Sequence, residues 1–127
     1  MIRGGTLLAL LAAVMLLVGA GAYWLWKHGG ALECVDRVIE EVPSPDGSVI
    51  AARWERACGG AVATHVSLRA GGSPFATDEL DEVYVAKARP RVAMHWEDAA
   101  SLAIDASERS ISSERRRWRN ITVRWRR

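Results

Sequence analysis

The chain has 127 residues, half of them hydrophobic and a quarter charged, and a formal net charge of +2. This length fits one domain and excludes a multidomain enzyme, a dinucleotide-binding or P-loop fold of ordinary size, and a transporter with several membrane spans. The average composition conceals an uneven layout, because Leu7 to Trp26 form a run of 20 residues without a charge, 18 of them apolar and two of them glycine. About 95 to 100 residues remain for a folded body, which is enough for one modest core.

The apolar run predicts a membrane anchor, residues 1–27. As a helix, residues 7–26 would rise about 30 Å and cross the hydrocarbon core of a lipid bilayer once. The run ends in aromatic residues followed by Lys27, a pattern typical of the membrane–water interface. A cleaved signal peptide is the alternative, with Arg3 as its basic start and Ala22 as the last residue removed. We favour the uncleaved anchor because the apolar run continues beyond Ala22.

Two cysteines, Cys34 and Cys58, follow the apolar run and the predicted linker, residues 28–33. An even pair in a small exported domain is usually a disulfide. In an antiparallel hairpin that turns at Asp46 and Gly47, the two cysteines lie opposite each other, close enough to bridge. We therefore place the domain on the periplasmic or extracellular side of a bacterial cytoplasmic membrane. Two unrelated thiols in a cytosolic domain are the alternative.

Residues 34–127 are predicted to form one extracytoplasmic β domain with a basic C-terminus. Short runs of alternating polar and apolar residues are separated by turn residues, and no clear amphipathic helix follows the anchor. The pattern predicts a mainly β protein: a transmembrane helix followed by a small, mostly antiparallel domain of six or seven strands. Residues 71–82 are expected to form a loop, and residues 108–118 fit either a helical turn or a polar loop. The predicted strands fall within residues 35–42, 49–55, 62–68, 83–86, 91–96, 101–105 and 121–125.

Each predicted strand has an apolar face, and we expect these faces to form a single core. Trp54, Trp96 and Trp125 lie on such faces. Core positions are favoured over an exposed platform for sugars or bases, because a small domain needs large core residues. The expected core residues are Ile50, Ala52, Trp54, Val66, Leu68, Met94, Trp96, Leu102, Ile104 and Val123.

The order of motifs resembles that of an uncharacterised family of small bacterial envelope proteins with an N-terminal hydrophobic segment and one short β domain. The matching segments are Val42 to Gly47, Trp54 to Arg56, Cys58-Gly59, Thr64 to Leu68, Trp96 to Ile104 and Ile121 to Trp125. The resemblance implies export, a Cys34–Cys58 disulfide and a single β domain, and it implies no activity. The sequence departs from that family in its last strand, which has more arginines.

Charge is also distributed unevenly. Seven arginines lie in residues 115–127, which contain no acidic residue, whereas the rest of the chain has ten basic and fifteen acidic residues. These arginines could be neutralised by the acidic body or by the anionic headgroups of a membrane, and a solvated strand is the alternative. The candidate membrane-contact residues are Arg115, Arg116, Arg117, Arg119, Arg124, Arg126 and Arg127.

No catalytic, cofactor-binding or metal-binding residues are expected. The sequence has no nucleophile elbow, P-loop, dinucleotide-binding glycine pattern or HExxH motif. His65 and His95 fall on the polar phase of their strands and could be neighbours on one sheet face, but a metal ion would need further ligands. The acidic segment 78–82 lacks the ligand spacing of a calcium loop and predicts a solvated loop.

These features predict a membrane-anchored extracytoplasmic β domain that acts as a non-enzymatic interaction or envelope-associated module. Its expected partners are the bilayer, through residues 7–26, and either anionic headgroups or an unknown envelope protein. Nucleic acid is not expected as a partner, because an exported protein meets little of it. The alternative function is that of a secreted or periplasmic ligand-binding protein released by cleavage after Ala22.

Overall fold

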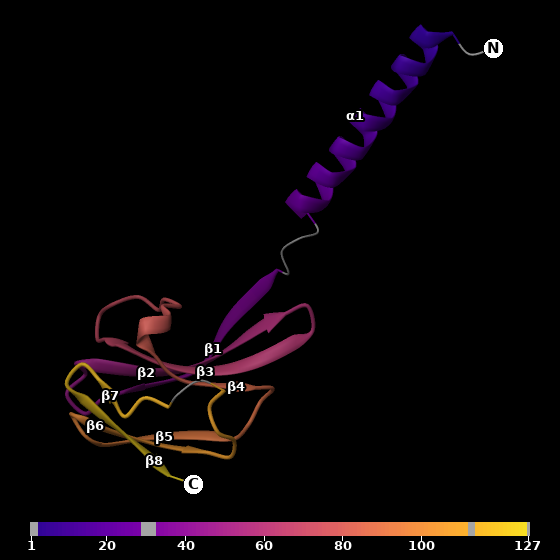
Figure 1. Cartoon of the computed structure of the whole chain (residues 1–127). Helices are drawn as coiled ribbons and strands as arrows, with labels where there is room; N and C mark the ends of the chain where they lie inside the picture. The colour runs from indigo at the N-terminus through magenta and orange to yellow at the C-terminus, as the bar shows by residue number, and fades with distance from the viewer. Residues whose placement is uncertain (1–2, 29–32, 112–113, 127) are drawn as a thin grey trace. The chain divides into compact units, whose positions relative to one another are not determined.

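The computed structural model describes residues 3–28, 33–111 and 114–126. The chain divides into two compact units, Met1–Glu33 and Cys34–Arg127. Among the described residues, the first unit has one helix, and the second has eight strands and one 3₁₀ turn (Figure 1). The elements are α1 (Gly4–His28), β1 (Cys34–Pro43), β2 (Val49–Cys58), β3 (Ala61–Ala70), η1 (Glu79–Asp81), β4 (Glu82–Lys87), β5 (Val92–Asp98), β6 (Ser101–Ala106), β7 (Arg117–Trp118) and β8 (Ile121–Arg126).

The helix α1 is long and apolar enough to cross a membrane. Its segment Gly4–Lys27 has 24 residues, and an 18-residue window within it has a mean hydropathy of 2.2 and no buried residue. Met15, for example, is 77% exposed. At the end of the helix, the rings of Tyr23 and Trp26 lie 6.3 Å apart, and the Lys27 ammonium lies 5.9 Å from the centre of the Tyr23 ring. The predicted apolar helix is therefore confirmed.

The first sheet has the strand order β1-β2-β3-β4, and all its pairs are antiparallel. The turn between β1 and β2 is built as the sequence predicts. The Asp46 carboxylate accepts hydrogen bonds from the hydroxyl groups of Ser44 and Ser48, both at 2.8 Å, and from the Ser48 backbone N–H at 3.1 Å. Gly47 has a φ of +72°, a conformation that favours glycine. The turn thereby determines which residues of β1 and β2 pair next to it.

The predicted disulfide is confirmed at the open end of this hairpin. Cys34 and Cys58 face each other in the register, with a bonded S–S distance of 2.04 Å and Cα atoms 4.2 Å apart. The register shifts by one residue between Val38 and Glu40, which marks a β-bulge in β1. The bulge lies between the turn and the disulfide, and its extra residue in β1 brings Cys34 opposite Cys58; without it, Cys34 would face Gly59.

The second sheet has the order β5-β6-β8-β7. Strands β5 and β6 form a hairpin whose tip is held by the Asp98 carboxylate, which accepts a hydrogen bond of 2.8 Å from the Ala100 N–H. Strand β8 pairs with β6 in parallel and with β7 antiparallel. The mostly antiparallel fold is confirmed, with eight strands rather than six or seven in the described residues. The additional strand is the two-residue β7, within a segment expected to be a helical turn or a loop.

The two sheets pack face to face around one core (Figure 1). Six predicted core residues are buried in it, and Met94 packs against it: the six are Val66, Leu68, Trp96, Leu102, Ile104 and Val123. The prediction for β2 is wrong, because Val49 and Ala51 belong to the core whereas the expected residues do not: these are Ile50, Ala52 and Trp54. Both faces of β2 are covered, so alternation alone could not identify the face that meets the second sheet.

We predict that loss of the disulfide lowers the free energy of unfolding by about 3.5 kcal/mol, because the bond closes a loop of about 25 residues in the unfolded chain. Urea unfolding of the wild type and of the double variant Cys34→Ser/Cys58→Ser measures this difference. The wild type with added reductant should behave like the double variant. Equal unfolding midpoints in all three samples would contradict the prediction.

We predict that Trp96→Ala costs roughly 3–5 kcal/mol of stability, because the side chain fills the core and is only 8% exposed. Its indole Nε1–H also donates a hydrogen bond of 2.8 Å to the Val42 carbonyl oxygen in β1, on the other sheet. Trp96→Phe is the matched control. It keeps a ring but loses this hydrogen bond, and it should cost about 1–3 kcal/mol. Thermal melting of both variants is the measurement, and a Trp96→Ala variant that melts like the wild type would show that Trp96 does not support the core.

Candidate functional site

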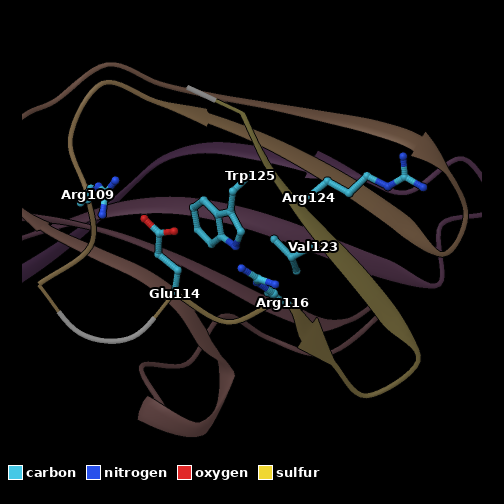
Figure 2. A pocket seen from close by; sticks show the side chains of 6 residues that line it. All are labelled: Arg109, Glu114, Arg116, Val123, Arg124 and Trp125. Carbon is cyan, nitrogen blue, oxygen red and sulfur yellow. The ribbon is translucent and has the colours of Figure 1, made fainter.

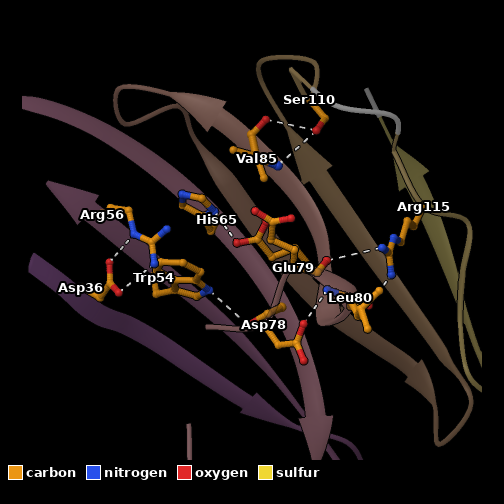
Figure 3. Close-up of polar contacts among 12 residues, drawn as sticks. Asp36, Trp54, Arg56, His65, Asp78, Glu79, Leu80, Val85, Ser110 and Arg115 are labelled. Carbon is orange, nitrogen blue, oxygen red and sulfur yellow. Dashed lines mark hydrogen bonds and ion pairs between the residues drawn. The ribbon is translucent and has the colours of Figure 1, made fainter. Parts of the chain in front are cut away.

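The segment that leaves the second sheet after β6 is hydrogen-bonded to the edge of β4 before it returns to the second sheet at β7. The Ile111 N–H donates to the Val85 carbonyl oxygen at 2.8 Å. The Ser110 hydroxyl bonds both the N–H and the carbonyl of Val85, each at 3.1 Å (Figure 3). The Tyr84 hydroxyl donates to the Glu108 carbonyl at 2.8 Å. These bonds fix the chain to β4 just before and just after Arg109 in the sequence.

Further along, the same segment is held by Arg115. Its guanidinium group donates to the carbonyl oxygens of Glu79 and Leu80 in η1 (Figure 3). Its own carbonyl accepts a hydrogen bond of 2.9 Å from the indole Nε1–H of Trp125. The Val123 N–H donates to the carbonyl oxygen of Arg116, the residue after Arg115, also at 2.9 Å. The segment is thereby joined to β8.

A groove of about 730 Å³ lies between this segment and β8; we call it the arginine groove. Its lining residues are Arg109, Glu114, Arg116, Val123, Arg124 and Trp125. Figure 2 shows Arg109, Glu114 and Arg116 around the ring of Trp125, which is itself packed 5.7 Å from the ring of Tyr84. The side chain of Arg124 extends away from that ring (Figure 2). Its Nη1 lies 3.6 Å from the Glu97 carboxylate.

Salt bridges divide the arginines of the domain into two groups. Every arginine in residues 34–108 has a carboxylate oxygen within 4 Å. These arginines are Arg37, Arg53, Arg56, Arg69, Arg89 and Arg91. In residues 109–126, among those that the structure describes, only Arg124 has such a partner. We call this second group the basic edge: Arg109, Arg115, Arg116, Arg117, Arg119, Arg124 and Arg126.

Other contacts of the basic edge leave its charge in place. Arg119 lies over the ring of Trp118, with its guanidinium carbon 4.5 Å from the ring centre. Arg117 donates to the carbonyl oxygen of Arg119 at 3.2 Å. The two hydrogen bonds of Arg115 also end on backbone carbonyls. Carbonyl groups and rings orient a guanidinium group but do not neutralise it, so the basic edge has an excess of positive charge.

This arrangement is suited to binding anions. Guanidinium groups form paired hydrogen bonds to carboxylates and phosphates, and two of them, Arg109 and Arg116, flank a half-buried indole ring. Glu114 adds one negative charge to the groove, and its Oε1 accepts from the Ser110 N–H at 3.4 Å. The net charge of the groove side chains remains positive.

The structure shows where the arginines expected to contact a membrane lie within the domain. Arg115 is engaged with η1, Arg124 with Glu97, and Arg127 lies outside the described residues. Arg109 was not expected in the set, because it is separated in the sequence from the C-terminal run of arginines. Its place beside Arg116 depends on the hydrogen bonds of the segment to β4, and no local sequence pattern indicates them.

The two histidines do not share a sheet face, which corrects the expectation from their strand phase. His65 lies in β3 of the first sheet, and His95 lies in β5 of the second. The Nδ1 atom of His65 is 2.9 Å from a carboxylate oxygen of Glu82 (Figure 3). Within residues 3–28, 33–111 and 114–126, no three His, Cys, Asp or Glu side chains gather in a way that could hold a metal ion.

The acidic segment 78–82 is engaged by other parts of the domain instead of being a simple solvated loop. Asp78 caps η1 by accepting from the Leu80 N–H at 3.0 Å. Asp81 accepts from the indole Nε1–H of Trp118 at 3.0 Å, and Glu82 contacts His65. The carboxylates of Asp78, Asp81 and Glu82 thus have different partners, and those of Asp81 and Glu82 fix the segment to other strands.

Trp54 is fully buried on the outer face of the first sheet. Its ring is stacked on the His65 ring at 4.1 Å and meets the edge of Phe75 at 5.6 Å. Its Nε1–H donates to the Ser67 hydroxyl at 3.1 Å. Because the ring has no free face, Trp54 is neither part of the main core nor an exposed stacking platform.

An ion pair borders this cluster. Arg56 Nε and Nη2 donate to the two oxygens of Asp36 at 2.7 and 3.0 Å (Figure 3). The hydrogen bond from Arg56 holds the pKa of the Asp36 carboxyl below its ordinary value, against a weaker opposing effect of burial. The stabilisation is present above the unfolded-state pKa of about 3.9 and is lost as the pH falls through the folded-state value.

We predict that Asp36→Asn lowers stability near neutral pH by less than about 1 kcal/mol, because the pair is partly exposed. Its deficit relative to the wild type should shrink as the pH falls below about 4. Urea midpoints measured across this pH range test the prediction, and Arg56→Gln, which removes the other partner, should show the same trend. A deficit of Asp36→Asn that stays constant at acidic pH would contradict it.

No family model, no curated protein and no solved structure matches this chain. The observations that bear on function are therefore those of the molecule itself: the apolar helix α1, the disulfide between β1 and β2, and the basic edge with its arginine groove.

Proposed function

We propose that this protein is a single-pass, membrane-anchored extracytoplasmic β domain that acts as a non-enzymatic interaction module of the bacterial envelope. The observation that carries the proposal is the surface of α1. Its 24-residue apolar segment is entirely exposed, and a soluble protein rarely leaves so large an apolar surface in water. A bilayer is the environment in which this surface is stable, because a helix of this length matches the hydrocarbon thickness.

The disulfide supports the extracytoplasmic side. Bonds such as Cys34–Cys58 persist in oxidising compartments, whereas cytosolic thiols are kept reduced. The charges that flank α1 give little orientation, because Arg3 at one end is balanced by Lys27 at the other. In this proposal, the orientation of the protein in the membrane is therefore inferred from the cysteines. The resemblance of the motif order to small bacterial envelope proteins agrees with it.

The basic edge supports an interaction role. Apart from Arg124, which pairs with Glu97, its arginines have no carboxylate within 4 Å among the described residues. Guanidinium groups position anions by hydrogen bonding and charge. A binding function uses these properties directly.

The alternative is a ligand-binding protein released into the periplasm by cleavage after Ala22. Residues 20–22 have the small side chains that a signal peptidase accepts, and they lie within α1, which continues to His28. Both forms would have the same β domain and the same groove. They differ in whether the protein remains in the membrane.

We predict that the mature protein retains α1 and stays in the membrane pellet after alkaline carbonate washing. Leu11→Arg, which puts a charge at the middle of α1, should move the protein out of the membrane fraction, because such a charge costs about 3 kcal/mol there. Lys27→Gln, at the end of the helix, is the matched control and should not. Protease added outside spheroplasts should digest the β domain.

N-terminal sequencing distinguishes the two forms. A mature chain that begins at Tyr23 would exclude the anchor and support the released protein. A β domain that resists external protease in intact spheroplasts but is digested after lysis would place it in the cytoplasm and overturn both.

A further inference from the structure

We propose that the arginine groove binds the phosphodiester headgroup of an anionic phospholipid. The inference rests on the proposed membrane anchoring and names the partner of the basic edge. It is carried by the contrast in salt bridges: arginines up to Arg91 are paired within the domain, whereas Arg109 and Arg116 have no carboxylate partner among the described residues.

Half of the fourteen acidic residues in residues 34–127 are already engaged by arginine or histidine side chains. Seven of them form salt bridges to arginine or contact His65: Asp36, Glu40, Glu41, Glu55, Glu82, Glu97 and Asp105. Asp46, Asp78 and Asp98 accept hydrogen bonds in turns, and Asp81 accepts from Trp118. Apart from Arg124, the arginines of the basic edge have no carboxylate within 4 Å among the described residues, so their guanidinium groups can take an anion from outside the domain.

The chemistry of the groove suits a phosphodiester. Arg109 and Arg116 supply planar donors that match the oxygens of a phosphate group. Trp125 and Val123 supply an apolar wall for the glycerol part. Tryptophan is enriched at membrane–water interfaces. The volume of about 730 Å³ leaves room for a headgroup.

The rest of the basic edge favours a lipid surface over a single small anion. Arg117 and Arg119 lie at β7 and its turn, and Arg126 lies on β8, so positive charge extends beyond the groove along two neighbouring strands. An extended anionic surface can answer such a row of charges, at about 1 kcal/mol for each basic residue close to it. Only five residues, 29–33, separate α1 from β1 in the sequence, so a domain tethered by α1 stays near the bilayer.

The test uses the full chain in non-ionic detergent micelles, titrated with dihexanoyl phosphatidylglycerol. The readout is NMR of the Trp125 indole N–H and the arginine Nε–H groups. We expect the signals of Trp125, Arg109 and Arg116 to shift together, with an effect that weakens as salt is added. Dihexanoyl phosphatidylcholine should leave them unchanged. If both lipids give the same shifts, the groove does not select an anionic headgroup and the proposal fails.

Charge variants locate the effect. Arg116→Gln should raise the midpoint of the titration about fivefold, the factor that corresponds to about 1 kcal/mol. Glu114→Gln removes the negative charge of the groove and should lower the midpoint. Arg37→Gln, in β1 of the other sheet, removes the same charge as Arg116→Gln and should have no effect. An equal loss in the variants of Arg37 and Arg116 would mean that only net charge matters, which would overturn the groove.

Two further titrations separate other ligands from a lipid. Glycerol phosphate that saturates the groove as well as phosphatidylglycerol would identify a soluble phosphate ester as the ligand, and an acidic peptide that displaces phosphatidylglycerol at lower concentration would identify a protein partner. Either result overturns the lipid assignment. Because the micelle titration does not depend on where α1 resides in the cell, its failure would leave the anchoring intact, and a failure of anchoring in carbonate washing would be seen separately.

Discussion

The two four-stranded sheets have no strand in common, so the domain depends on side chains packed between them. Tryptophan indoles bridge this interface with hydrogen bonds as well as apolar surface: Trp96 reaches from β5 to Val42 in β1, and Trp118 reaches from β7 to Asp81 beside β4. A domain of this size buries a limited core, and large rings with one satisfied polar atom bury much surface per residue. The disulfide restricts the unfolded chain and adds to this modest core.

The sequence was sufficient to predict the elements that depend on local chemistry. The apolar helix, the Asp46–Gly47 turn, the cysteine pairing and the alternating strands all follow from residue types and spacing. The face of β2 could not be predicted, because Phe75 and its loop bury Trp54 on the side away from the second sheet. The parallel pairing of β6 with β8 and the approach of Arg109 to Arg116 depend on the path of the chain between strands, which alternation does not encode.

The distribution of charge connects the fold with the proposed role. The first sheet neutralises its arginines in place: Arg53 and Arg69 of β2 and β3 pair with Glu40 and Glu41 of β1 across the strands. Such pairs orient side chains on a folded surface, and exposed ones add little to stability. Along β7 and β8, among the described residues, only Arg124 has a salt-bridge partner, Glu97, so mutual repulsion among the other arginines is less relieved. An anionic partner would remove that repulsion, which makes binding and local stability two effects of the same contacts.

The strand order also determines when the domain can be completed. The pairs β1–β2, β2–β3 and β5–β6 join neighbours in the chain, and such local pairs assemble quickly. Strand β8 is the last in chain order, yet it lies between β6 and β7. The second sheet therefore cannot form fully until β8 has emerged. Until then, the apolar face of the first sheet is not fully covered. Before that point, we expect a half-assembled intermediate that exposes this face, and its lifetime determines how much protection against aggregation the nascent protein requires.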